Sequence, residues 1–161
     1  MTEPQRHRLN RSLPLRNALL LALLLQSISG CSLFGGKTAD VRSIELVADG
    51  TANEFSATAI DIVFVYQTSA ASLLPTDGPA WFARRDSLRN TLASQADIVS
   101  LQVPPPYASF SVSLPKRYKD AVRVVAFANF LTVAGQAPID LSGYKHAVLR
   151  LRTDRIDIGN R

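Results

Sequence analysis

Few side chains in this chain could carry out catalysis. Beyond residue 30 the sequence contains one histidine, His146, and no Gly-x-Ser-x-Gly turn that would present a nucleophilic serine. A zinc site needs three or four ligands from cysteine, histidine and carboxylates, and the carboxylates here are scattered singly. Glycine-rich phosphate loops and dinucleotide fingerprints are also missing. We therefore predict that the protein is not an enzyme, that it has no metal or cofactor, and that His146 is a solvated strand residue.

The single cysteine points to a different covalent chemistry. Cys31 directly follows Ile28, Ser29 and Gly30, so a branched apolar residue and two small residues precede the thiol. This order resembles the bacterial lipobox, in which the cysteine receives a diacylglyceryl group and, after cleavage, an N-terminal acyl chain. Small residues leave the backbone beside the thiol accessible to the modifying enzyme and the peptidase. We predict covalent lipid on Cys31, and the alternative is an ordinary signal peptide with a chance cysteine at its cleavage site.

Residues 1–30 have the layout of a lipoprotein signal peptide. A basic segment precedes an apolar run at residues 18–25, which is shorter than the about 20 residues that span a bilayer. This leader contains four arginines (Arg6, Arg8, Arg11 and Arg16) and one acid (Glu3). Three of the five net positive charges therefore belong to the leader, and residues 31–161 carry a net charge of +2. The basic composition of the whole chain thus gives no reason to expect a nucleic-acid partner.

The predicted organisation of the mature chain is a lipidated flexible tether, residues 31–39, followed by one β-sandwich domain, residues 40–161. Several acyl chains together hold a protein firmly at a membrane. Ser32 follows the cysteine, and serine at this place favours export of a lipoprotein to the outer membrane. We predict a lipid-anchored outer-membrane protein whose domain lies in the periplasm.

Most of this domain alternates apolar and polar residues with the period of a β-strand. The predicted strands are residues 43–48, 59–66, 97–103, 108–114, 121–130, 145–152 and 156–158. The run 59–66 is apolar on both faces apart from Asp61, which predicts a central strand. Three prolines, 104–106, predict an extended link that is not a hairpin, and the last two strands are expected to form one.

One segment has helical spacing instead. Residues 76–79 offer a capping residue and a proline for the first turn of a helix over residues 79–93. About seven strands and one helix predict a β-sandwich in which the helix covers an edge or an open end. Trp81 and Phe82 either anchor a partner or pack this helix onto the sandwich.

Other polar groups leave alternatives open. Asp61 either lies at a strand edge, pairs with an arginine or marks a buried functional site. Arg84, Arg85 and Arg89 either form a solvated helix face or meet acidic lipid headgroups or an acidic partner.

The segment between the first two predicted strands is longer than a tight hairpin needs. Its central residues are Gly50, Thr51, Ala52, Asn53, Glu54, Phe55 and Ser56. Loops at the end of a sandwich are common binding surfaces. We predict either a partner-binding loop, with Phe55 as its one bulky apolar residue, or a plain solvent loop.

Read in order, these features resemble the outer-membrane lipoprotein family of the type VI secretion system, TssJ. The resemblance covers the mature chain. In its first half it rests on the lipobox, the first strand with its Ala52-Asn53 loop, and the Val- and Tyr-rich run 62–67. Further along it rests on the helical insertion with Trp81-Phe82, the strand 124–130 and the terminal hairpin. Segments 68–74 and 131–137 depart from the family pattern.

This resemblance implies a transthyretin-like, mainly β sandwich of seven to eight strands with one short helical insertion. It also implies an anchoring role. The loop would bind the periplasmic C-terminal domain of TssM, a large inner-membrane protein, with Asn53 and Phe55 as the expected contact residues. No small-molecule substrate is expected. The alternatives are an envelope lipoprotein that binds a small ligand or another envelope protein, and an envelope hydrolase built on His146.

Overall fold

The computed structural model describes residues 38–132 and 136–161. The signal peptide and the lipobox, with Ile28, Ser29, Gly30 and Cys31, lie outside the described residues. Ala39 is already part of the folded domain, since only 5% of it is exposed and its N–H donates to the carbonyl of Ala121 at 2.7 Å. The folded domain thus includes Ala39, which the sequence assigned to the tether.

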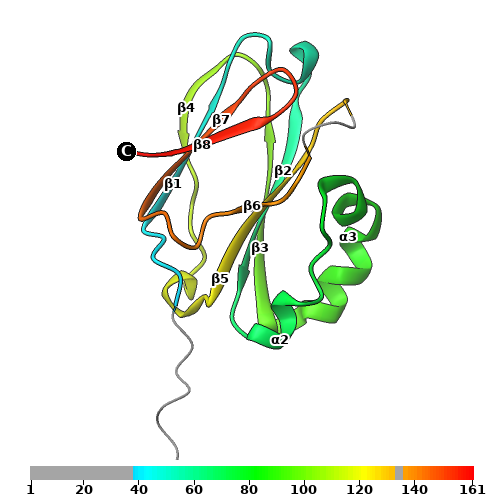
Figure 1. The fold of residues 1–161 in the computed structure, drawn as a ribbon, viewed down its shortest axis with the longest axis vertical. Helices are drawn as coiled ribbons and strands as arrows, with labels where there is room; N and C mark the ends of the chain where they lie inside the picture. Colours follow the sequence, from blue (N-terminus) through cyan, green and yellow to red (C-terminus); the bar gives the residue numbers. More distant parts are fainter. Residues whose placement is uncertain (1–37, 133–135) are drawn as a thin grey trace, which may run out of the picture. The chain divides into compact units, whose positions relative to one another are not determined.

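Two four-stranded sheets form the domain (Figure 1). The first sheet has the order β4–β1–β7–β8, with strands Tyr107–Ser111, Ser43–Ala48, His146–Leu151 and Ile156–Asn160. The second has the order β3–β2–β5–β6, with strands Ala96–Val103, Thr58–Val65, Arg123–Asn129 and Ile139–Asp140. Neighbouring strands are antiparallel except β1 and β7, which are parallel. The predicted mainly β, two-sheet fold is confirmed.

Helical segments lie between the strands. The longest is α3, Gly78–Leu92, and the others are short: η2 (Ala52–Phe55), α2 (Thr68–Ala71), η3 (Ala93–Gln95) and η4 (Tyr118–Asp120). Helix α3 begins where the sequence predicted, because the carboxylate of Asp77 accepts the backbone N–H of Ala80 at 2.7 Å and Pro79 occupies the first turn.

Strand β2 is buried on both faces, as its apolar run predicted. Ile60, Ile62 and Phe64 point into the core between the two sheets. Val63 and Val65 point the other way, into a second apolar cluster under α3. With β3 on one side and β5 on the other, β2 is a central strand.

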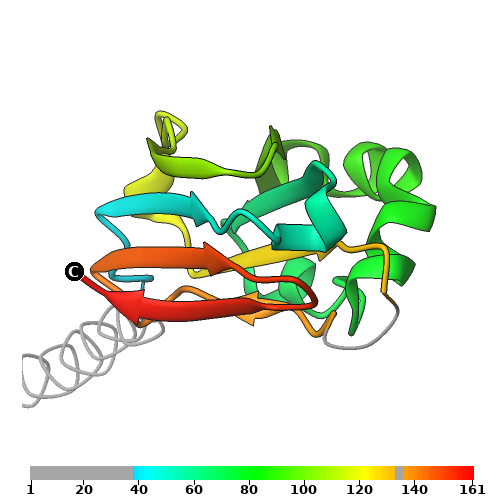
Figure 2. The same ribbon diagram turned by 90° about the horizontal axis from the view of Figure 1, so that it is seen from above.

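The predicted position of the helix was wrong. Instead of covering an edge or an open end, α3 packs on the outer face of the β3–β2–β5–β6 sheet, away from the other sheet (Figures 1 and 2). The indole of Trp81 stacks on Phe127 of β5 with ring centroids 4.6 Å apart. The physical reason is that β2 and β5 carry apolar residues on this second face, which would otherwise be exposed to water.

The two predicted connections are confirmed. Prolines 104–106 link β3 to β4, and these strands belong to different sheets, so the link is not a hairpin. Strands β7 and β8 form the expected antiparallel hairpin. Strands β4 and β5 are shorter than predicted, because the chain turns away from the ladder after Ser111 and joins β5 only at Arg123.

Strand directions define two ends of the domain. The loop end includes segments 49–57, 104–106, 130–132 and 152–155, and it lies at the top of Figure 1. The N-proximal end consists of segments 38–42, 116–121 and 142–145. Backbone hydrogen bonds from Ala39 to Ala121, from Asp40 to Ser142 and from Arg42 to Lys145 join these segments. Strand β1 runs directly from the N-proximal end to the loop end.

Gly78 sets how closely α3 approaches β5. A Cβ atom at this position would overlap the carbonyl oxygen of Ala128, which belongs to the backbone and cannot rotate away. We expect Gly78→Ala to lower the free energy of unfolding by about 1–3 kcal/mol, the usual cost of overpacking. Chemical denaturation measures this cost. Gly143→Ala is the control, since its Cβ meets nothing within 4 Å; equal stability of the two variants would contradict the close approach.

Candidate partner-binding loop

The loop between β1 and β2 has an unusual backbone. Asn53, Glu54 and Phe55 have φ angles of 46°, 52° and 63°, the left-handed region that non-glycine residues rarely adopt. Each such residue costs on the order of 1–2 kcal/mol. A run of three is stable only if the surroundings hold it, so the loop has one defined shape rather than that of a plain solvent connection.

Asn53 is the residue that holds this shape. It is only 2% exposed, although it lies in a loop. Its Oδ1 accepts the backbone N–H of Leu131 at 2.7 Å, and its Nδ2 donates to the carbonyl of Ala57 at 3.2 Å. Its own N–H donates to the carbonyl of Arg152 at 3.1 Å. The side chain of Asn53 therefore bonds the loop to the segment that follows β5, and its backbone N–H bonds the loop to the β7–β8 turn.

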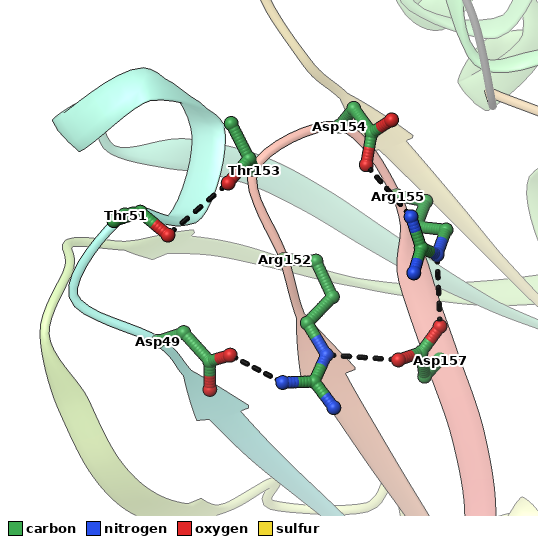
Figure 3. Close-up of polar contacts among 7 residues, drawn as sticks. All are labelled: Asp49, Thr51, Arg152, Thr153, Asp154, Arg155 and Asp157. Carbon is green, nitrogen blue, oxygen red and sulfur yellow. Dashed lines mark hydrogen bonds and ion pairs between the residues drawn. The ribbon is translucent and has the colours of Figure 1, made fainter.

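Ion pairs fix the same loop from its other side (Figure 3). Arg152 lies between two carboxylates, with Nη1 2.5 Å from Asp49 and Nε 2.8 Å from Asp157. The hydroxyl groups of Thr51 and Thr153 are 3.1 Å apart, which adds a contact between the loop and the turn. The turn and the loop thus form one polar network at the loop end.

Electrostatics keep this network charged at neutral pH. The hydrogen bond from Arg152 lowers the pKa of Asp157, and hydrogen bonds to Asp157 and Asp49 raise the pKa of Arg152. Because the pKa of Asp157 is lowered on folding, the pair stabilises the fold above the ordinary carboxyl pKa near 3.8. That stabilisation is lost as the pH falls through the folded-state pKa. Both groups face solvent, so salt screens the pair.

Exposure divides the predicted loop residues into two groups. Ala52 and Asn53 are buried, whereas Gly50, Thr51, Glu54 and Phe55 are exposed and Ser56 is intermediate. Phe55 is 76% exposed and Leu131 is 63% exposed, and the hydrogen bond from the Leu131 amide to Asn53 places both at the loop end. Within the predicted binding loop, Phe55 is available to a partner and Asn53 is positioned to support the loop from inside.

Sequence analysis missed Leu131 and Thr153. Leu131 lies 78 residues from Asn53 in the sequence, and no local sequence pattern predicts the hydrogen bond between them. The available signal was an apolar residue directly after the end of a long strand, next to a polar connection. Thr153 lies in the connection of the predicted terminal hairpin, and its hydroxyl contacts that of Thr51.

Trp81 is a packing residue and not a partner anchor. Its side chain is fully buried, and Nε1 donates to Oδ2 of Asp61 at 2.8 Å. Arg85 lies 3.9 Å from the same carboxylate, which confirms that Asp61 pairs with an arginine and is not at a strand edge. Phe82 is partly buried against the cluster under α3, with the guanidinium of Arg85 5.8 Å from its ring centroid.

The three arginines of α3 do not form one free patch. Arg85 faces Asp61 and Phe82, and Arg89 donates from Nη2 to the hydroxyl of Ser100 at 3.0 Å. Arg84 is exposed.

His146 is exposed on the outer face of the β4–β1–β7–β8 sheet, as predicted. Its Nδ1 lies 3.0 Å from the hydroxyl oxygen of Ser43 on β1. A serine nucleophile also needs a carboxylate that orients the imidazole and donors for an oxyanion. Within residues 38–132 and 136–161 no Asp or Glu pairs with this imidazole. The contact is therefore that of two neighbours on a parallel strand pair, and the absence of enzymatic activity stays a prediction.

The cavity between the edges of the two sheets is small. A cavity of about 80 Å³ opens between the edge strands β3 and β4, lined by Leu101, Gln102, Val103, Tyr107 and Phe110. Small-molecule sites usually measure about 300–1,000 Å³. Of the part of the chain that the structure describes, no group of three or more His, Cys, Asp or Glu could hold a metal ion. In that same part, none of the helices has the length and apolarity to cross a membrane.

The arrangement defines a two-sheet β-sandwich with an outer helix and one internally braced loop, and solved structures share this fold. The type VI secretion lipoprotein TssJ1 from Pseudomonas aeruginosa superposes with a TM-score of 0.56 at 14% identity, covering 74% of this chain and 94% of that one. Serratia marcescens Lip, a membrane-bound component of the type VI secretion system, gives 0.54 at 10% identity over 74% and 96%. A chain of a type VI membrane complex gives 0.50 at 14% identity over 73% and 95%.

No protein-family model and no curated protein sequence matches the chain. The structural similarity to type VI secretion proteins confirms, for the fold, the family resemblance that was stated from the sequence. The chain spans nearly the whole length of these two matched proteins.

Replacing Asn53 tests whether it braces the loop. Asn53→Ala leaves the amide of Leu131 and the carbonyl of Ala57 without their side-chain partner, so we expect a loss of about 1–3 kcal/mol in the free energy of unfolding. Hydrogen exchange of the Leu131 amide should also accelerate. Glu54→Ala, an exposed neighbour with similar backbone angles, serves as the control. A variant Asn53→Ala with wild-type exchange at Leu131 would contradict the bracing role.

Proposed function

We propose that the protein is a non-enzymatic outer-membrane lipoprotein of a type VI secretion system. In this proposal it anchors the membrane complex by binding the periplasmic domain of a TssM-like inner-membrane protein. The observation that carries the proposal is the fold shared with two type VI secretion lipoproteins over 94% and 96% of their chains. The lipobox-like sequence ending at Cys31 is an independent indication of the same class.

The position of the loop supports the partner assignment. The proposed lipid lies on the N-terminal side of β1, and the braced loop lies at the other end of that strand. Phe55 projects an apolar ring from a backbone that is held in place before any partner binds, which reduces the entropy lost on association. Exposed aromatic residues on rigid supports are frequent hot spots of interfaces.

Binding of the domain, residues 38–161, to the periplasmic C-terminal domain of a TssM-like protein from the same organism tests the proposal. The domain contains both of its apolar clusters, so it suits the experiment without the leader. We expect Phe55→Ala to weaken binding at least about tenfold, as for an interface hot spot. Titration calorimetry measures the change.

A matched control is available on the same domain. Leu73, just after α2, is also an exposed apolar residue, at 45% exposure, and it lies outside the loop end. Leu73→Ala should leave the affinity unchanged. Equal losses of affinity in the two variants would indicate that the interface does not centre on the loop. Absence of binding by the folded domain would reject the proposed partner.

Lipid attachment has its own test in the full-length chain. We expect the mature protein to begin at Cys31, to carry the mass of a diacylglyceryl and an acyl group, and to fractionate with the outer membrane. Cys31→Ser should lose both the lipid mass and that fractionation, because the hydroxyl group cannot form the thioether. Ser32→Ala is the control and should behave as wild type. Outer-membrane fractionation of Cys31→Ser would exclude anchoring through this cysteine.

A further inference from the structure

The N-proximal end of the domain gathers basic side chains. Its segments 38–42, 116–121 and 142–145 contain five basic residues (Arg42, Lys116, Arg117, Lys119 and Lys145) and two acidic ones (Asp40 and Asp120). The loop-end segments have the opposite balance, with two basic residues (Arg152 and Arg155) and three acidic ones (Asp49, Glu54 and Asp154). The segments at the two ends of β1 therefore carry net charges of opposite sign.

Internal contacts neutralise only part of this basic end. Arg117 stacks on the ring of Tyr66 with its guanidinium 4.1 Å from the centroid, and its Nε lies 3.7 Å from Asp120. Four exposed cations of these segments form no ion pair within the described residues: Arg42, Lys116, Lys119 and Lys145. Backbone bonds from Arg42 to Lys145 and from Ala39 to Ala121 hold their segments together. The result is a basic surface on which four cations have no ion-pair partner within the described residues.

An aromatic residue lies within this surface. Tyr118, which is partly buried, separates Lys116 and Arg117 from Lys119, and the Nζ of Lys119 is 5.7 Å from its ring centroid. Tyrosine between basic residues is typical of segments at a membrane–water interface, where the ring lies at headgroup level and the cations meet phosphates. An acidic protein surface would explain the charges but not why they gather where the chain enters the domain.

The position of Cys31 favours a membrane surface over an acidic protein surface as the partner of these cations. Seven residues lie between Cys31 and Ala39. The eight steps from one Cα to the next span at most about 29 Å when fully extended, and about 16 Å on average if the chain is flexible. If lipid is attached there, as in the proposed function, the N-proximal end stays close to the headgroups. Salt limits the attraction between exposed charges to about 8–10 Å under physiological conditions. A tether of this length lets the N-proximal end reach the headgroups within that distance.

We propose that the N-proximal end, through Lys116, Lys119, Arg42 and Lys145, rests on the anionic phospholipid headgroups of the membrane that anchors the chain. This contact orients β1 away from the bilayer and directs the loop end toward the periplasm. The inference rests on the lipid anchor of the proposed function, but not on the identity of the protein partner.

Sedimentation of the domain, residues 38–161, with phosphatidylcholine vesicles that contain or lack phosphatidylglycerol tests this contact. We expect binding only to the anionic vesicles, weakened by added salt, and about tenfold or more weaker in Lys116→Glu/Lys119→Glu. Arg84→Glu/Arg89→Glu on α3 has the same change in net charge at another face and should bind as wild type. Circular dichroism confirms that both variants are folded.

Each other outcome overturns the inference. Equal binding to neutral and anionic vesicles, or none to either, excludes a headgroup contact. Equal losses in the two variants indicate that net charge alone governs binding, and a larger loss in the α3 variant places the contact on the helix. Partner binding by Lys116→Glu/Lys119→Glu should remain at wild-type strength because the loop end is distant along β1. A failed partner assay therefore tests the proposed function separately from this contact.

Discussion

The burial of β2 on both faces is the constraint around which the domain is arranged. Its inner residues Ile60, Ile62 and Phe64 need the other sheet, and its outer residues Val63 and Val65 need α3. Asp61 on the outer face adds a polar requirement, because an unpaired carboxylate at 1% exposure would be very costly. The indole N–H of Trp81 meets it at 2.8 Å. The helix is therefore placed by one hydrogen bond and an apolar cluster together, and the close approach at Gly78 follows from that placement.

The loop depends on long-range contacts in the same way. Three successive left-handed residues have no local reason to persist, and their cost is offset by bonds to segments far away in the sequence. Asn53 suits the site because asparagine tolerates this backbone region better than most residues and supplies both an acceptor and a donor. A serine or an alanine at this position would satisfy at most one of these two backbone groups. Rigidity at the loop end thus originates in one amide group and the Arg152 network.

Local sequence patterns predicted most of the fold but little of the structure of the β1–β2 loop. Alternation identified β1, β7 and β8, and the capping Asp77 with Pro79 located the start of α3 within one residue. The face that α3 covers was misjudged, since apolarity on both sides of β2 shows that two partners are needed without showing which element supplies the second. The contact between Asn53 and Leu131 joins residues 78 positions apart, and a single amide in a polar loop has no periodicity to reveal it.

The path of force through the proposed anchor follows from the topology. A pull between lipid on the N-terminal side and a partner at the loop passes along β1, which connects the two ends directly. Strand β1 lies inside its sheet, with antiparallel β4 on one side and parallel β7 on the other. Such a load is directed along the strand, so it strains the hydrogen bonds of both ladders at once in shear instead of opening them one by one. A central first strand therefore suits a domain that couples a membrane anchor to a protein partner.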